Sequence, residues 1–198
     1  DHGALDAHGT VNVAPSRDFE RLLADSRYDM SAGLRDLDLN VWIPAAGYPE
    51  IPLLGTVDAT ARVRGRYPLV SLTGDLDLAN GSIARMPIDA FHVGVATHGR
   101  TLDVTDARLA APGLTATAHG PVGLRPGGAI ALDVHASTDD IPALVQQVAH
   151  TNVAIAGGIE ATVQIDGTLG KPTFAAAFDS SGLDAYGLKI DSLFGQVK

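Results

Sequence analysis

The chain of 198 residues contains no cysteine, and aromatic residues make up only 5% of it. Disulfides, thiolate metal sites, iron–sulfur clusters and thiol catalysis are therefore excluded. Positive charge is also scarce, with 14 Lys and Arg against 23 Asp and Glu and a formal net charge of −9. This balance argues against nucleic-acid binding, because a surface that reads phosphates needs clustered Lys and Arg. No apolar run approaches the roughly 18 residues of a membrane span.

Apolar and polar residues alternate along much of the chain, 45% of which is apolar. From Thr56 to Arg64 the odd positions are apolar and the even positions polar, which is typical of a strand with one buried face. Similar alternation occupies residues 36–43, 70–78, 91–95, 102–105, 114–119, 130–135 and 159–166. Turn signals are Asn80-Gly81, His98-Gly99, Pro112-Gly113, Pro126-Gly127-Gly128 and Ser181-Gly182. Together these patterns predict about a dozen strands in antiparallel hairpins and meanders.

Two segments have helical spacing instead. The first starts at Pro15-Ser16, with Ser16 as the expected N-cap; its apolar stripe is Phe19, Leu22 and Leu23. The second follows Asp139-Asp140; its apolar stripe is Ile141, Leu144, Val145 and Val148. We expect both helices to plug or cap the end of a sheet.

An internal repeat sets the domain organisation. Residues Gly55–Gly65 align with Gly157–Gly167 without a gap, and Leu37–Leu39 parallels Leu132–Val134 upstream. A period of about 100 residues is too long for the usual solenoids and suggests a multi-strand unit laid end to end. We therefore expect an N-terminal segment with a short helix over 1–30 and a repeated β unit over 31–198. The two repeats would cover 31–130 and 131–198, the second of them truncated.

The alternation creates a large apolar face that must be covered. A β-sandwich or a barrel would cover it with protein, but such cores usually contain more large aromatic residues. The predicted fold is therefore all-β: an elongated antiparallel sheet curled into an open hydrophobic groove, with one or two short helices. A closed β-sandwich without lipid, acting as a scaffold or adhesin module, is the alternative. The residues expected to line the groove are Val57, Ala59, Val63, Leu72, Leu76, Val93, Leu132, Val134, Ile159, Val163 and Ile165.

Candidate catalytic and metal-binding residues have simpler interpretations. His92, His119 and His135 fall on polar strand faces, and no pair of them has the spacing of a zinc motif. Asp139-Asp140 is better placed to cap a helix than to act as an acid pair. Neither a Gly-x-Ser-x-Gly elbow nor a phosphate-binding Gly-x-x-x-x-Gly-Lys loop occurs. We therefore expect no enzyme activity, no cofactor and no metal.

Over most of residues 31–198 the chain resembles a known family in the order of its motifs. These are Leu132–Val134, Asp140–Leu144, Ile155–Gly158, Val163–Pro172 and Gly182–Leu193. This order of strand, short helix, glycine step, strand ending in Gly-Thr-Leu, proline and hairpin is similar to the recurring unit of the TamB/AsmA-like superfamily. The first unit departs from it, because 43–49 stands where a helix would be expected and Arg66-Tyr67-Pro68 replaces the Gly-Thr-Leu step.

The resemblance implies a non-catalytic segment of a protein that is anchored in the inner membrane and crosses the periplasm. It also implies a hydrophobic groove, called a β-taco, that conducts phospholipids towards the outer membrane or supports outer-membrane protein assembly. The implied partners are phospholipid acyl chains, an outer-membrane barrel (TamA-like) and the inner membrane, reached through an anchor outside this chain. We expect such a segment to be an internal part of the longer protein, since the chain begins at Asp1 without an initiator Met.

Overall fold

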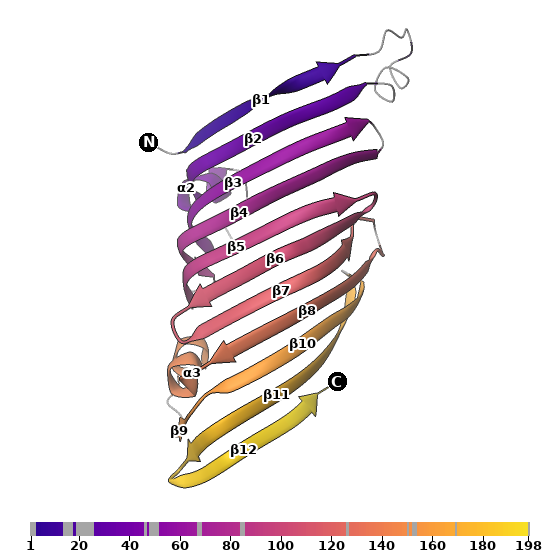
Figure 1. Ribbon diagram of the computed structural model, residues 1–198. Helices are drawn as coiled ribbons and strands as arrows, with labels where there is room; N and C mark the ends of the chain where they lie inside the picture. Colours follow the sequence, from indigo (N-terminus) through magenta and orange to yellow (C-terminus); the bar gives the residue numbers. More distant parts are fainter. Residues whose placement is uncertain are drawn as a thin grey trace.

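One antiparallel sheet makes up nearly the whole molecule in the computed structural model (Figure 1). The structure describes residues 3–13, 18, 26–45, 47, 52–66, 69–83, 86–125, 127–149, 151, 154–168 and 170–197. The sheet has 12 strands and is open, with β1 at one edge and β12 at the other. The prediction of an all-β, open antiparallel sheet with short helices is therefore confirmed.

The strands are β1 (Ala4–Asn12), β2 (Arg27–Asp38), β3 (Leu53–Arg66), β4 (Leu69–Ile83), β5 (Met86–His98), β6 (Thr101–Ala111), β7 (Leu114–Gly123), β8 (Ala129–Thr138), β9 (Ile155–Ala156), β10 (Ile159–Thr168), β11 (Lys171–Ala185) and β12 (Leu188–Val197). The helices are α2 (Leu39–Ala45) and α3 (Ile141–Ala149). Each strand pairs with the next along the chain, except that β8 pairs with β10 and the short β9 pairs with β11. Both helices lie at the same side of the sheet, on the left in Figure 1.

The strand alternation predicted from the sequence corresponds to two different faces. Along β3, residues 57, 59, 61 and 63 are buried or half-buried, whereas 58, 60, 62 and 64 are exposed. Strands β7 and β10 repeat this pattern. We call the first side the apolar face and the second the polar face. Within the described part of the chain the sheet has no second sheet packed against it.

The structure corrects the strand predicted over 36–43. The strand β2 ends at Asp38, and the helix α2 begins at Leu39. The Asp38 carboxylate accepts a hydrogen bond from the backbone N–H of Asn40 at 2.9 Å, which is the contact of a helix N-cap. Just before it, Asp36 has a positive φ of 54° and the register with β3 shifts, so a β-bulge ends the alternation. The apolar residues at 39, 41 and 43 therefore belong to a helix, although the first unit was expected to lack one.

Two of the predicted turns are also wrong. Asn80-Gly81 lies inside β4, and Ser181-Gly182 lies inside β11. Asn80 has φ 50° and Gly182 has φ 69°, so each pair forms an irregularity within a continuing strand. His98-Gly99 and Pro112-Gly113 do lie where β5 turns into β6 and β6 into β7.

The internal repeat is also seen in the structure, where equivalent strands and helices begin a constant number of residues apart. Strands β2 and β8 begin 102 positions apart, at Arg27 and Ala129, and helices α2 and α3 begin at Leu39 and Ile141. The same offset relates β4 to β11 at both ends, and the starts of β5 and β12. It also relates Gly55 (φ 131°) to Gly157 (φ 124°). The counterpart of Asp38 is Asp140, which caps α3 through the N–H of Ala143 at 3.0 Å, so the upstream match of Leu37–Leu39 with Leu132–Val134 is not the structural one.

The N-terminal segment contributes to the same sheet. Residues 4–12 form β1, which pairs along its length with β2, and β2 runs across position 31. The helix predicted from Ser16 onwards lies outside the described residues, apart from Asp18. The second predicted helix is confirmed as α3.

The best-buried part of the molecule lies beneath α2. Val57, Leu78 and Ile88 form the core cluster there, exposed by 6%, 5% and 2%. Leu39 at the start of α2 packs against this cluster. In Figure 1, α2 lies behind the sheet, so the view is onto the polar face and the apolar face is turned away. This core cluster lies at one end of strands β3–β5, and Ala107, Ala111, Ile130 and Leu183 are buried elsewhere on the sheet.

Candidate functional site

The apolar face carries a row of directly paired residues that crosses the whole sheet. Directly opposed residues of adjacent strands point to the same face. From β1 to β12 the row consists of Leu5, Leu34, Ala59, Leu76, Val93, Ala107, Ala118, Val134, Val163, Ala176 and Val197. Every member is aliphatic, and no polar side chain interrupts the row. Eleven strands thus contribute one continuous apolar surface.

All eleven residues predicted to line the groove lie on this face. Five of them belong to the row: Ala59, Leu76, Val93, Val134 and Val163. Beside it, Val63 pairs with Leu72, and Leu132 pairs with Ile165. Ile159 shares the face by its position on β10.

Val57 differs from the other ten in its burial. It lies in the core cluster beneath α2 and is only 6% exposed. Its contacts are therefore with protein, and it belongs to the core and not to the open surface.

The apolar face is least covered towards the two edges of the sheet. Leu5 on β1 is 75% exposed, and Val197 on β12 is 63% exposed. Phe174 on β11, which pairs with Ile165, is 56% exposed. Phe174 is not among the residues predicted to line the groove, although the alternation of Pro172, Phe174 and Ala176 with polar or small residues places it on this face. These exposed aliphatic and aromatic side chains leave the face open to a ligand.

The polar face carries charged side chains that interact in pairs. The Nδ1 atom of His92 lies 2.7 Å from an oxygen of Asp77 on the neighbouring strand. His119 approaches Asp133 at 3.9 Å, and Arg108 forms an ion pair with Asp106 at 2.8 Å. Of the three histidines considered for metal binding, His92 is on β5, whereas His119 and His135 are diagonal neighbours on the adjacent strands β7 and β8. Among the described residues, no three His, Cys, Asp or Glu side chains are placed to share a metal ion.

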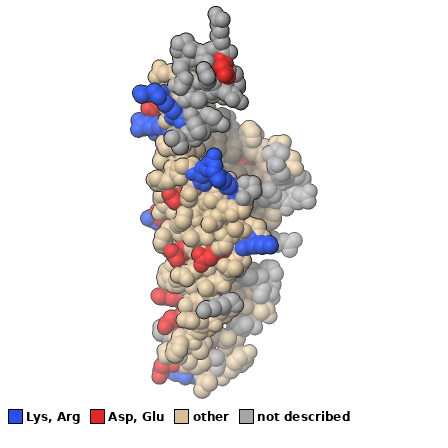
Figure 2. Space-filling model, turned by 90° about the vertical axis from the view of Figure 1, so that its right-hand side faces the viewer, with Lys and Arg blue, Asp and Glu red and all other residues tan. Residues whose placement is uncertain are grey.

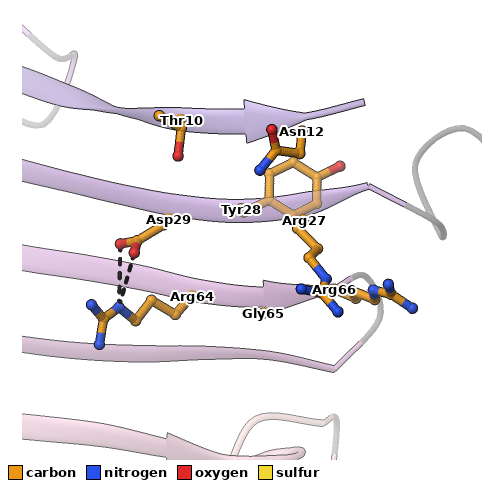
Figure 3. A pocket seen from close by; sticks show the side chains of 8 residues that line it. All are labelled: Thr10, Asn12, Arg27, Tyr28, Asp29, Arg64, Gly65 and Arg66. Atoms are coloured by element: carbon orange, nitrogen blue, oxygen red, sulfur yellow. Dashed lines mark hydrogen bonds and ion pairs between the residues drawn. The ribbon is translucent and has the colours of Figure 1, made fainter. Parts of the chain in front are cut away.

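A hollow of about 620 Å³ lies at the end of β1–β3, lined by Thr10, Asn12, Arg27, Tyr28, Asp29, Arg64, Gly65 and Arg66 (Figure 3). Within it, Asp29 accepts hydrogen bonds from Arg64 Nε at 3.2 Å and from Arg62 at 3.2 Å. The hydrogen bond from Arg64 is the main cause that lowers the pKa of Asp29. Arg62 adds to this effect, whereas partial loss of water around the carboxylate opposes it.

Replacing Arg64 should therefore raise the pKa of Asp29. We expect an Arg64→Gln variant to move the titration midpoint of the Asp29 carboxyl upwards, towards that of an ordinary aspartate, as measured by carboxyl-carbon NMR. Because the folded-state pKa is depressed, this cluster stabilises the fold at neutral pH, and the contribution is lost as the pH falls through that pKa. Arg108→Gln, whose partner is Asp106, is the control and should leave Asp29 unchanged. An unaltered midpoint in Arg64→Gln would show that the contact does not form in solution.

Comparisons with known proteins give no relative for this chain. No protein-family model, curated protein or solved structure matches it. The fold defines it as an open single-sheet β protein with an internal repeat. Within the described residues, neither helix has the length and hydrophobicity needed to cross a bilayer.

Proposed function

We propose that the apolar face binds phospholipid acyl chains and forms one stretch of a lipid conduit. The observation that carries this proposal is the uninterrupted aliphatic row from Leu5 to Val197 on a sheet that, within the described residues, has no second sheet over it. A soluble domain rarely leaves a contiguous apolar surface of this extent uncovered unless something binds there. The closed β-sandwich alternative needs a second sheet, which the described part of the chain does not have.

The length of the aliphatic row favours a path for lipids over a single binding pocket. Eleven strands about 4.8 Å apart extend the row over about 50 Å. The acyl chains of one bilayer leaflet span about 15 Å, half of the hydrocarbon thickness. The row is therefore about three times as long as one lipid tail, and each of the eleven strands contributes an aliphatic side chain to it. Each acyl CH₂ removed from water contributes roughly 0.8 kcal/mol, so a tail can bind anywhere along the row without a specific polar contact.

The resemblance to the TamB/AsmA-like superfamily supports a location for this activity. On that basis we propose a periplasmic segment of a longer protein anchored in the inner membrane. It would conduct phospholipids between the inner and outer membranes or support outer-membrane protein assembly, together with an outer-membrane barrel partner. The proposed role is non-catalytic and needs no cofactor. The 102-residue structural repeat, from α2 at Leu39 to α3 at Ile141, is consistent with such a serial architecture.

Photo-crosslinking at neighbouring positions on opposite faces tests the proposal. Val163 lies on the apolar face between Val134 and Ala176, and Gln164 follows it on the exposed polar face. A photoreactive residue at position 163 should capture phospholipid when the protein is expressed in a diderm bacterium, and one at 164 should capture little. Mass spectrometry of the crosslinked adduct identifies the captured lipid.

Two results would refute the lipid conduit. The first is equal capture at 163 and 164, which would show that the crosslinker only reports nearby membrane. The second is the absence of co-purifying lipid together with protein capture at 163, which would favour the scaffold or adhesin alternative.

A further inference from the structure

The two rims of the sheet, formed by opposite ends of its strands, differ in charge. One rim, opposite the helices, lies on the right in Figure 1, and we call it the basic rim. Its charged residues, within the described ends of β2–β11, are Arg27, Arg66, Arg100, Arg125 and Lys171. All five are exposed. Figure 2 looks onto this rim and shows Lys and Arg atoms at several heights, with most carboxylates along the left profile, which is the polar face.

The opposite rim, which holds α2 and α3, is mainly acidic. It carries Asp38, Asp139, Asp140 and Asp184, with Arg35 and Lys189 as its described basic residues. On the basic rim, Asp18 lies in the connection between β1 and β2, and Asp29, Asp103 and Asp166 lie two residues inside the ends of β2, β6 and β10. Of these, Asp29 pairs with Arg62 and Arg64, and Asp103 pairs with His98. In a chain with a net charge of −9, a rim with five cations is a concentration of positive charge that composition alone does not predict.

Within the described residues, the cations of the basic rim have no carboxylate partner. Arg62 and Arg64 pair with Asp29, but no carboxylate in the described part of the chain pairs with any of the five rim residues. Arg27 and Arg66 even lie directly opposite each other in the β2–β3 ladder. Like charges in that position destabilise a sheet. A ligand with negative charge would offset this repulsion.

The cations are spaced closely enough to form a continuous row of positive charge beside the apolar face. Arg100 is in the β5–β6 turn, Arg125 in the β7–β8 connection, and Lys171 begins β11. Arg27 and Arg66 are on adjacent strands, and Arg100 and Arg125 are two strands apart, which is about 10 Å. This is close to the Debye length at physiological salt, so the attraction of one cation overlaps with that of the next. Arginine also binds phosphate in a bidentate geometry that fits its planar guanidinium.

The basic rim borders the apolar face. On β10, Ile165 lies three residues before Thr168, whose partner across the ladder is Lys171. At about 3.3 Å per residue, the distance from the apolar side chains to the rim is about 10 Å. A phospholipid whose tails lie on the apolar face can therefore place its phosphate at the rim.

We propose that the basic rim binds the phosphate of phospholipid headgroups and selects lipids with a net negative headgroup over zwitterionic lipids. The lipid then lies along the strands in one orientation, with its headgroup at the basic rim and its tails pointing towards the acidic helix rim. This inference rests on the proposed lipid conduit and adds the headgroup class to it.

The test measures which lipid the protein extracts. The full chain is incubated with vesicles of equal amounts of phosphatidylglycerol and phosphatidylcholine, re-isolated, and its bound lipids are quantified by mass spectrometry. The variant Arg66→Gln/Arg100→Gln/Arg125→Gln removes three rim cations. The control Arg35→Gln/Arg108→Gln/Lys189→Gln removes three exposed cations elsewhere, so both take the net charge from −9 to −12.

The lipid bound to the wild type and to the control should be enriched in phosphatidylglycerol. In the rim variant this preference should fall about fivefold for each arginine removed. Extraction of both lipids in equal amounts by wild type would overturn the headgroup inference and leave the conduit intact. Extraction of neither lipid would overturn both. A further arm adds inorganic phosphate at constant ionic strength. Free phosphate should compete for the rim and reduce the preference; a preference that phosphate leaves unchanged would show that the rim does not bind the headgroup phosphate and would overturn the inference.

Discussion

Val163→Asp is expected to remove lipid from the part of the row around β10 while the protein still folds, and so to lower the total lipid bound. Val163 is the ninth of the eleven row residues, and its partners across the ladder, Val134 and Ala176, provide no positive charge. A carboxylate there must contact the acyl chain without a counter-ion. A charge placed in hydrocarbon costs roughly 2.5 kcal/mol or more. This corresponds to about 100-fold weaker occupancy of that part of the row. The measurement is lipid bound per protein by mass spectrometry after incubation with vesicles.

Gln164→Asp is the matched control for this prediction. It introduces the same carboxylate one residue away on the exposed polar face. Circular dichroism should show the same strand content for both variants. If the Val163→Asp variant is folded and binds as much lipid as Gln164→Asp, the apolar face is not a lipid conduit.

Gly120→Ala is expected to destabilise the sheet more than any other glycine-to-alanine change discussed here. Gly120 in β7 has a φ of 134°, which side chains rarely adopt, and an added Cβ would overlap the carbonyl oxygen of Ala131 on β8. Because this contact is with backbone, β7 and β8 would have to separate. We expect a loss of roughly 2–4 kcal/mol in the free energy of unfolding, combining the strained φ with the steric overlap. Urea denaturation measures it, and hydrogen exchange should localise the opening to β7 and β8.

Gly170→Ala separates the effect of steric overlap from the general effect of removing a glycine. Gly170 is in the β10–β11 turn, where an added Cβ meets no atom within 4 Å. The free energy of unfolding of this variant should stay within about 0.5 kcal/mol of the wild-type value, as for most surface substitutions. Equal midpoints for the two variants would mean that β7 and β8 are not in this close register.

The assignment of side chains to the two faces could be predicted from the sequence because it is a local property. In a strand, successive side chains point to opposite sides, so the alternation along 56–64 determined which residues share a face. The same reasoning failed at Leu39, Val41 and Ile43. There, the bulge at Asp36 and the cap formed by Asp38 started a helix, and both depend on contacts that alternation does not contain.

The sequence alone therefore determined the strand content, the division of the strands into one apolar and one polar face, and the presence of a repeat of about 100 residues. The tertiary structure decided which apolar residues are covered, because α2 packs over Val57 but leaves Phe174 exposed. It also decided that Arg66, Arg100 and Arg125 share one rim. That arrangement depends on where each strand ends and on which direction it runs, and both are fixed by long-range pairing between strands and not by the local sequence.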